Sequence, residues 1–278
     1  MKRVTKRVAV SLSVALLATV SAGVLAIEQY NGESSEPFAP KGYSQEKSLF
    51  AMPSEWDIYA GLTLPFYSDG TNNAVSVPNP AISPGEVDYL VQTSDSTSNG
   101  VVIGIDRAWM FANADKTTVK GFSLGVMFDT GPVTFSGSVN QTFPGQGIPN
   151  YSFYNYTYRA KPNDVALDAD LYPFEIKALH LLPYLFVGGG FSAINLTYNQ
   201  IPVANSGFTP VSASESVTRP LGLIGVGLRC NPTQHLFLKV QYLYHYRGSA
   251  TLNNNQLQSG PAVQLNSQTV DFLAGLSF

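Results

Sequence analysis

Ionisable side chains recur at every second position in several apolar segments of this 278-residue chain. Asp168 and Asp170 stand two residues apart, a spacing that in an extended strand points both carboxyls to one face. Paired carboxyls of this kind suit general acid and base chemistry, and His245 offers another titratable group. If all the alternating segments are strands, eight ionisable residues of both signs fall on the face opposite the apolar one. They are Asp57, Asp168, Asp170, Asp271, Arg229, Lys239, His245 and Arg247.

The elements that must position these groups are strands. In the last eleven residues, QTVDFLAGLSF, Val270, Phe272, Ala274, Leu276 and Phe278 alternate with Thr269, Asp271, Leu273, Gly275 and Ser277. A terminal strand with one apolar face suits a β-barrel whose exterior touches lipid and whose interior is polar. The same two-residue period recurs from Trp56 onward.

Composition supports strands rather than helices. Charged residues are 13%, aromatic residues are 12% and mean hydropathy is +0.03. Basic residues followed by an apolar run make residues 1–26 a predicted signal peptide. Its removal takes away four of 16 lysines and arginines and none of 19 acids, so the formal net charge falls from −3 to −7. A mature chain this acidic has no electrostatic footprint for nucleic acid.

Residues 27–53 are polar and interrupted by prolines, which predicts a flexible periplasmic segment, and residues 54–278 are predicted to form the barrel. The eight expected strands cover residues 54–66, 119–129, 132–142, 163–174, 181–197, 217–230, 235–247 and 267–278. Short connections such as Thr130 to Pro132 alternate with long ones such as 68–118, as expected for periplasmic turns and surface loops.

The stretch from Val87 to Phe111 also alternates and raises a ten-stranded alternative. However, Asp106 and Arg107 are adjacent, so one of the two charges would face lipid. A lipid-facing arginine costs about 2–4 kcal/mol at the membrane midplane. We therefore expect this hairpin at or above the outer rim.

The chain resembles the small outer-membrane β-barrels of the OmpA and OmpX type. The similarity covers roughly residues 54–278 and rests on LDADLYPF…LLPYLFVGGGF, on PLGLIGVGLRCNPTQHLFLKVQYLY and on the terminal QTVDFLAGLSF. It implies a Gram-negative outer-membrane location, contact with lipid, and recognition of Phe278 by the outer-membrane insertion machinery. It specifies a class of fold and leaves function open.

An eight-stranded barrel has an interior only wide enough for side chains to fill it. Charges in so narrow a lumen must pair, because an isolated buried ion costs several kcal/mol. The eight residues of mixed charge gathered above therefore predict an ion-pair network that plugs the barrel. A small channel for a narrow or hydrophobic solute is the alternative, and ten strands would favour it.

The sequence gives no strong enzyme signal. Asp168 and Asp170 fall within the expected membrane span, where substrate has poor access. Outer-membrane lipid A deacylases use a serine two residues after the histidine, whereas Arg247 stands there in this chain, so a lipid hydrolase at His245 is disfavoured. No metal-ligand spacing or cofactor motif occurs.

Aromatic residues crowd the stretch SFYNYTYR: Tyr151, Phe153, Tyr154, Tyr156 and Tyr158. Two compatible interpretations remain: they continue two strands above the membrane as a protruding sheet, and they supply exposed contact area for a host or envelope partner. The leading hypothesis is a non-enzymatic barrel that presents surface loops for adhesion, recognition or envelope integrity.

Overall fold

The structure is a computed structural model that describes residues 54–67, 74–76, 87–111, 119–142, 151–176, 179–204, 209–252 and 262–278. The expected signal peptide and the segment 27–53 lie outside these residues. The strands are β1 (Ser54–Tyr67), β2 (Ala74–Ser76), β3 (Val87–Thr97), β4 (Gly100–Met110), β5 (Gly121–Thr130), β6 (Val133–Thr142), β7 (Tyr151–Tyr172), β8 (Leu181–Pro202), β9 (Val211–Cys230), β10 (Leu236–Tyr246), β11 (Ser249–Thr251), β12 (Ala262–Gln264) and β13 (Ser267–Ser277). Among the described residues, no helix has the length and apolar character to cross a membrane.

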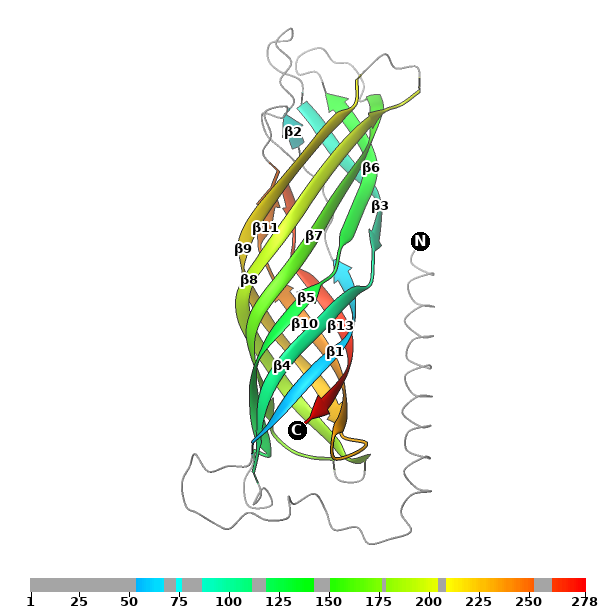
Figure 1. Cartoon of the computed structure of the whole chain (residues 1–278). Helices are drawn as coiled ribbons and strands as arrows, with labels where there is room; N and C mark the ends of the chain where they lie inside the picture. The colour runs from blue at the N-terminus through cyan, green and yellow to red at the C-terminus, as the bar shows by residue number, and fades with distance from the viewer. Residues whose placement is uncertain are drawn as a thin grey trace.

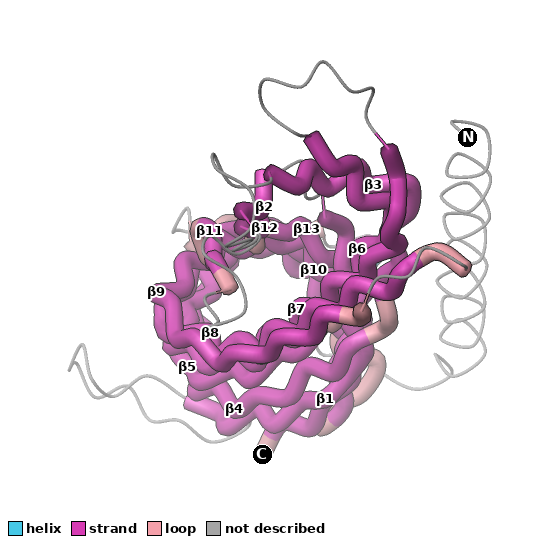
Figure 2. The backbone as a smooth tube through the Cα atoms, turned by 90° about the horizontal axis from the view of Figure 1, so that it is seen from above, coloured by secondary structure: helices cyan, strands magenta, loops and turns pink. Residues whose placement is uncertain are grey.

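Eight of these strands form a closed antiparallel ring. Each pairs with two neighbours in the order β1, β4, β5, β7, β8, β9, β10, β13 and back to β1. Figure 2 looks along the axis of this ring and shows β3 and β6 displaced to one side of it. The predicted eight-stranded barrel is confirmed, and the ten-stranded alternative is wrong.

The two ends of the chain's barrel segment close the ring. Ile58 pairs with Leu276 and Tyr59 with Gly275 in the β1–β13 register. Below them, the backbone N–H of Trp56 donates to the carbonyl of Phe278 at 2.9 Å, and the reciprocal bond measures 3.0 Å. Closure of this kind satisfies backbone donors and acceptors without water and leaves no open sheet edge within the ring.

Three strands continue far beyond the ring. β7 and β8 have 22 residues each and β9 has 20, whereas β5 has 10 and β10 has 11. β7 pairs with β5 over residues 163–172 and with β6 over residues 151–160. β6 then pairs with β3, and β3 with β2. We call this upper part the extension: β2, β3, β6, the β11–β12 hairpin, and residues 151–161 of β7, 193–202 of β8 and 211–220 of β9 (Figure 1).

The structure corrects two of the predicted strands. Residues 132–142 are not in the ring, because β6 pairs with the upper part of β7 rather than with β5. Its place is taken by β4, the strand that the sequence argument moved above the membrane. The argument failed because Arg107 lies at the lower rim, where its guanidinium donates to Ser54 Oγ at 3.0 Å and faces the Trp56 ring at 5.5 Å. An interfacial arginine carries little of the midplane cost.

The turn from Thr130 to Pro132 was predicted to be periplasmic, and this too is wrong. β5 runs upward from Gly121, so its end at Thr130 lies at the upper side of the ring. There, Thr130 Oγ1 donates to the carbonyl of Pro162 at 2.9 Å, at the point on β7 where pairing with β5 gives way to pairing with β6. The connection therefore joins the ring to the extension.

Candidate functional site

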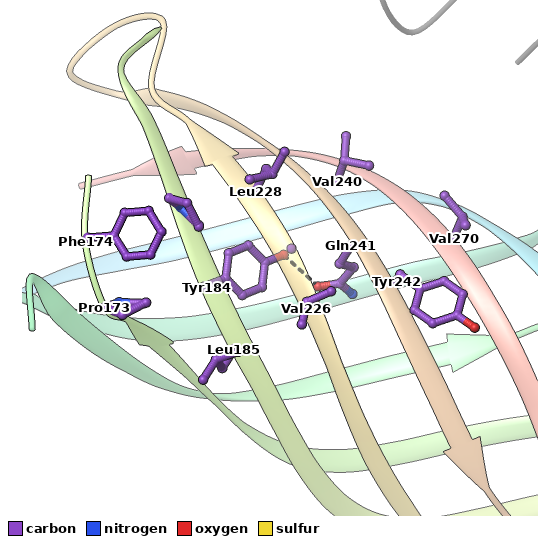
Figure 3. Close-up of a pocket in the computed structure, with 12 residues that line it drawn as sticks. Pro173, Phe174, Tyr184, Leu185, Val226, Leu228, Val240, Gln241, Tyr242 and Val270 are labelled. Carbon is purple, nitrogen blue, oxygen red and sulfur yellow. Dashed lines mark hydrogen bonds between the residues drawn. The ribbon is translucent and has the colours of Figure 1, made fainter. Parts of the chain in front are cut away.

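The exterior of the ring is apolar on every strand. The exposed fractions reach 70% for Leu167 on β7, 63% for Ile224 on β9 and 57% for Val187 on β8. Figure 3 shows a shallow groove on this exterior between β8, β9 and β10, lined by apolar side chains such as Leu185, Val226 and Val240. A continuous apolar surface of this extent is stable only when hydrocarbon covers it.

The interior of the ring holds ion pairs among buried aromatic and aliphatic side chains such as Phe237 and Leu243, beginning at its lower end. Arg229 forms an ion pair with Asp57, and both side chains are buried. Ser277 Oγ donates to the same carboxylate at 2.6 Å, and the Arg229 guanidinium lies 4.3 Å from the centre of the Phe237 ring. The arginine is therefore fixed by charge, hydrogen bonding and a cation–π contact.

A lysine holds the next layer of the lumen. Lys239 Nζ donates to Asp106 Oδ2 at 3.0 Å and to Asp170 Oδ2 at 2.9 Å. Above it, Tyr184 Oη donates to Gln241 Oε1 at 2.9 Å, and Gln241 Nε2 donates to Asp271 Oδ2 at 2.8 Å. Tyr184 fits because a Cβ on Gly227 would lie 2.3 Å from its ring. These contacts cross the lumen and fill it.

An apolar exterior around a closed ring, with ions paired inside, decides the class of this protein. The chain is an outer-membrane β-barrel. The lower end of the barrel, with its short β7–β8 and β9–β10 connections, corresponds to the periplasmic side, and the extension stands on the cell surface. Phe278 lies at the periplasmic end with 64% of its side chain exposed.

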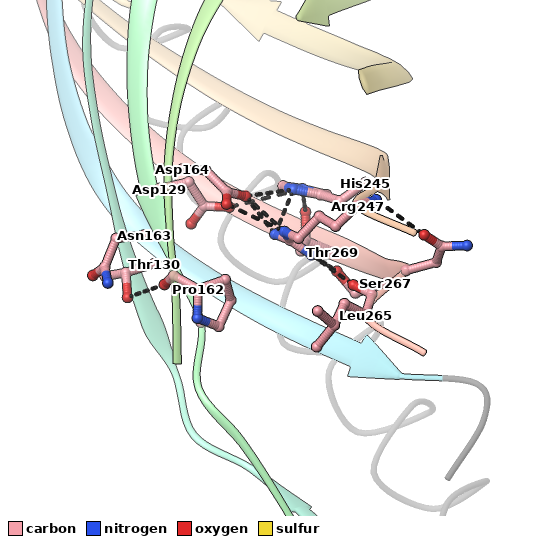
Figure 4. A network of polar contacts seen from close by, with 12 residues as sticks. Asp129, Thr130, Pro162, Asn163, Asp164, His245, Arg247, Leu265, Ser267 and Thr269 are labelled. Carbon is pink, nitrogen blue, oxygen red and sulfur yellow. Dashed lines mark hydrogen bonds and ion pairs between the residues drawn. The ribbon is translucent and has the colours of Figure 1, made fainter. Parts of the chain in front are cut away.

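A further polar cluster occupies the outer end of the lumen (Figure 4). Arg247 donates from Nε to Asp164 Oδ1 at 3.2 Å and from Nη2 to Asp164 Oδ2 at 2.5 Å. His245 places Nδ1 3.3 Å from Asp164 Oδ2, and its Nε2 lies 3.1 Å from Thr269 Oγ1 and 3.7 Å from Asp129 Oδ2. None of these charged side chains is more than 3% exposed.

The structure places all eight sequence-predicted charges in the interior of the barrel. They are Asp57, Asp168, Asp170, Asp271, Arg229, Lys239, His245 and Arg247, each at most 5% exposed. They do not form one connected network, since Asp168 has no hydrogen-bond partner among the described residues. Sequence reasoning missed Asp106, Asp129 and Asp164. Asp129 and Asp164 could have been found, because each lies on the polar side of an alternating segment that the sequence already predicted to be a strand.

The extension carries a larger share of aromatic and aliphatic side chains in its interior than the ring does. Its interior holds Phe135, Tyr154, Tyr156, Tyr158 and Tyr198, with at most 7% exposed. The expectation of exposed aromatic contacts is therefore wrong for Tyr154, Tyr156 and Tyr158, which face inward and support the alternative of a protruding sheet. Burial also raises the pKa of Tyr158 above its ordinary value. The side chains of Tyr151 and Phe153 lie outside the described part of the chain.

The outer face of the extension is largely polar, although Ile201 and Val91 are exposed on it. On β7, the outward positions above the apolar band are Asn155, Thr157, Arg159 and Lys161. Between β8 and β9, Ser212 Oγ donates to Asn199 Oδ1 and Ser216 Oγ to Asn195 Oδ1, both at 2.7 Å. This face meets water rather than lipid, because hydroxyl and amide groups replace the leucines and valines found lower on the same strands.

No protein-family description matches the sequence, and no curated protein does. The outer-membrane protein OprG from Pseudomonas aeruginosa is similar over 82% of this chain and 97% of its own, with 16% identity and a TM-score of 0.41. Ail, the attachment invasion locus protein of Yersinia pestis, is similar over 82% and 100%, with 14% identity and a TM-score of 0.33.

The outer-membrane protease OmpT from Escherichia coli is similar over 81% of this chain and 96% of its own, with 12% identity and a TM-score of 0.36. These proteins are small outer-membrane β-barrels, in the class that the sequence resembles.

Proposed function

We propose that this protein is a non-conducting, non-enzymatic outer-membrane barrel that presents its extension for adhesion, surface recognition or envelope integrity. One observation carries the proposal: paired ions fill the lumen at three heights, while β7, β8 and β9 continue above the membrane into a separately packed wall. A plugged lumen provides no aqueous path for a solute. A rigid polar surface held clear of the lipid suits contact with a partner.

The surface available for recognition is the polar face of β7, β8 and β9. Arg159 and Lys161 are exposed there, and the neighbouring surface residues are serines, threonines and asparagines. Neutral hydroxyl and amide groups offer adaptable hydrogen bonds, and the two cations favour an anionic partner. Such a partner is found either on a host surface or elsewhere in the envelope.

Two measurements test the proposal. In planar bilayers, the folded protein is expected to give no stable open-channel current, and large stable conductance would contradict the plug. On whole cells, Arg159→Ser combined with Lys161→Ser is expected to weaken adhesion or to alter sensitivity of the envelope to detergent. Glu55→Gln, a change at an exposed periplasmic site, is the matched control. Unchanged adhesion and unchanged envelope sensitivity would remove the support for recognition.

A second candidate, a path for a hydrophobic solute, has one observation in its favour. Residues 211–221 of β9 pair with β8 but, among the described residues, with no strand on their other side, and an aromatic and aliphatic cluster packs inside the extension. Uptake of a hydrophobic dye by cells separates the two functions. Faster uptake with the wild-type protein than with an empty vector would favour this path over a recognition surface.

A further inference from the structure

The lipid-facing side of the ring carries one cation near its periplasmic end. β1 and β4 lie side by side there (Figure 1), and Arg107 on β4 pairs in register with Trp56 on β1. The row directly above holds Ile58, Ile105 and Val126, which are between 41% and 47% exposed. A strand rises about 3.3 Å per residue, so Arg107 lies about 7 Å along the strand below this aliphatic row. Tryptophan beside it marks the boundary between hydrocarbon and headgroups.

The guanidinium of Arg107 is held in one orientation. Its Nε and Nη2 donate to Ser54 Oγ at 3.1 and 3.0 Å. Its central carbon lies 5.5 Å from the ring centres of both Trp56 and Trp109. The Trp109 ring is itself stacked on Phe122, with ring centres 4.9 Å apart. Two hydrogen bonds and two cation–π contacts therefore fix the group before any ligand arrives.

The charge of Arg107 has no counterion in the part of the chain that the structure describes. Its one hydrogen-bonding partner, Ser54, is neutral. The acids nearest in sequence are on the other side of the sheet, because Glu55 pairs with the inward-facing Ala108 and Asp106 pairs with the inward-facing Asp57. The N–H groups that do not reach Ser54 thus remain available to an external anion.

The position of this cation selects the kind of anion. Arg107 continues the surface that touches hydrocarbon, so an anion bound there lies beside acyl chains. The phosphate of a phospholipid has both properties, since it is anionic and joined to two acyl chains that would run upward along Ile58 and Ile105. A planar guanidinium matches the oxygen atoms of a phosphate in pairs, which makes arginine a strong ligand for this group.

We propose that Arg107, held by Ser54, Trp56 and Trp109, binds the phosphate of one phospholipid in the periplasmic leaflet of the outer membrane. The lipid occupies the outward groove between β1 and β4 at its periplasmic end. It neutralises the arginine and fixes the height of the first barrel strand in the membrane. This site lies at the opposite end of the barrel from the extension and does not depend on the proposed recognition function.

The chain provides its own probe for this site. It has two tryptophans, and both contact Arg107, so tryptophan emission reports on the guanidinium. The full processed chain is folded in an alkyl maltoside, a detergent without phosphate, and titrated with phosphatidylglycerol. We expect a saturable change in tryptophan emission. Diacylglycerol with the same acyl chains, and inorganic phosphate alone, are expected to give no saturable change, because each lacks one half of the ligand.

Substitution of the arginine gives the second arm of the test. In Arg107→Gln, the phosphatidylglycerol concentration at half-saturation is expected to rise about tenfold, because a charge-assisted contact is lost. The matched control is Arg219→Gln, which removes the same charge from the inward side of β9 in the extension and is expected to keep the wild-type value. Heat modifiability on gels confirms that each variant is folded. Equal half-saturation in wild type and in folded Arg107→Gln would overturn the proposal.

A measurement on the wild-type protein keeps the proposal testable if the variant does not fold. Native mass spectrometry of the wild-type barrel is expected to retain about one phosphatidylglycerol and to lose diacylglycerol at the same activation energy. Equal retention of the two lipids would show that the acyl chains alone hold the ligand, and would contradict a phosphate site at Arg107.

Discussion

Three strands, β7, β8 and β9, run through both the ring and the extension, and the side chains on their two faces differ between the two regions. On β7, the residues at 154, 156 and 158 face inward and are aromatic, whereas those at 164, 168 and 170 face inward and are acidic. The inward parity does not change along the strand. Only the solvent outside changes, from water above to hydrocarbon below, and the chemistry of each face changes with it.

This difference explains why each region needs its own form of internal stabilisation. In lipid, apolar side chains gain little by turning inward. The interior of the ring accordingly carries directional ion pairs and hydrogen bonds beside its buried aromatic and aliphatic side chains. In water, the extension gains from burying Phe135, Ile194 and Leu196. The two interiors meet near Pro162, where the partner of β7 changes.

The largest effect is expected from breaking the ion pair at the lower end of the ring. Asp57→Ala leaves Arg229 buried without its carboxylate, a change that costs about 3–5 kcal/mol. We expect the urea midpoint of the folded barrel to fall sharply in detergent. Glu55→Ala, two residues away and exposed, is expected to leave that midpoint unchanged.

A comparable loss in the extension should remain local. Phe135→Ala truncates a fully buried ring on β6, at a cost of about 3–5 kcal/mol. Because β6 contributes to the extension and not to the ring, proteolysis above the membrane should increase while heat modifiability persists. Loss of heat modifiability together with the extension would show that the two regions fold as one unit.

The outward face gives a smaller and more selective effect. Leu167→Arg places a cation on the lipid-facing side of β7, at a cost of about 2–4 kcal/mol. Asn155→Arg, on the same face of the same strand in the extension, is expected to cost almost nothing. The measurement is the yield of folding into lipid vesicles. If both substitutions lowered this yield equally, the lipid-facing part of β7 would extend to Asn155, contrary to the account.

The smallest effect is expected on the polar surface. Ser216→Ala removes an exposed hydrogen bond to Asn195 and should change the free energy of unfolding by less than about 0.5 kcal/mol. A much larger loss by chemical denaturation would show that this face is packed against another part of the protein.

The sequence was sufficient for the number of strands in the ring but not for the identity of each. Val133, Phe135 and Val139 alternate as regularly as any membrane strand, yet they face the interior of the extension. Alternation shows that a strand has two faces and does not say which face meets lipid. The polar side of β6 carries only neutral residues such as Thr134 and Ser136, whereas every ring strand except β8 places an aspartate, lysine or arginine on its inward side.

The charge network was predictable residue by residue, but its pairing was not. Lys239 reaches Asp106 and Asp170 across the lumen, through sequence separations of 133 and 69 residues. Such partners depend on strand order and stagger, which alternation does not encode. Asp106 was missed because its strand was excluded on the assumption that Arg107 lay deep in lipid.

The most direct test of this difference between the two regions is a scan of single cysteines along the outward face of β7, in a background where Cys230 is replaced by alanine. In intact cells, a water-soluble maleimide is expected to label Asn155→Cys and Arg159→Cys, and to leave Leu167→Cys and Ala169→Cys unmodified. Equal labelling at all four positions would contradict the account, because it would mean that one solvent surrounds the whole strand.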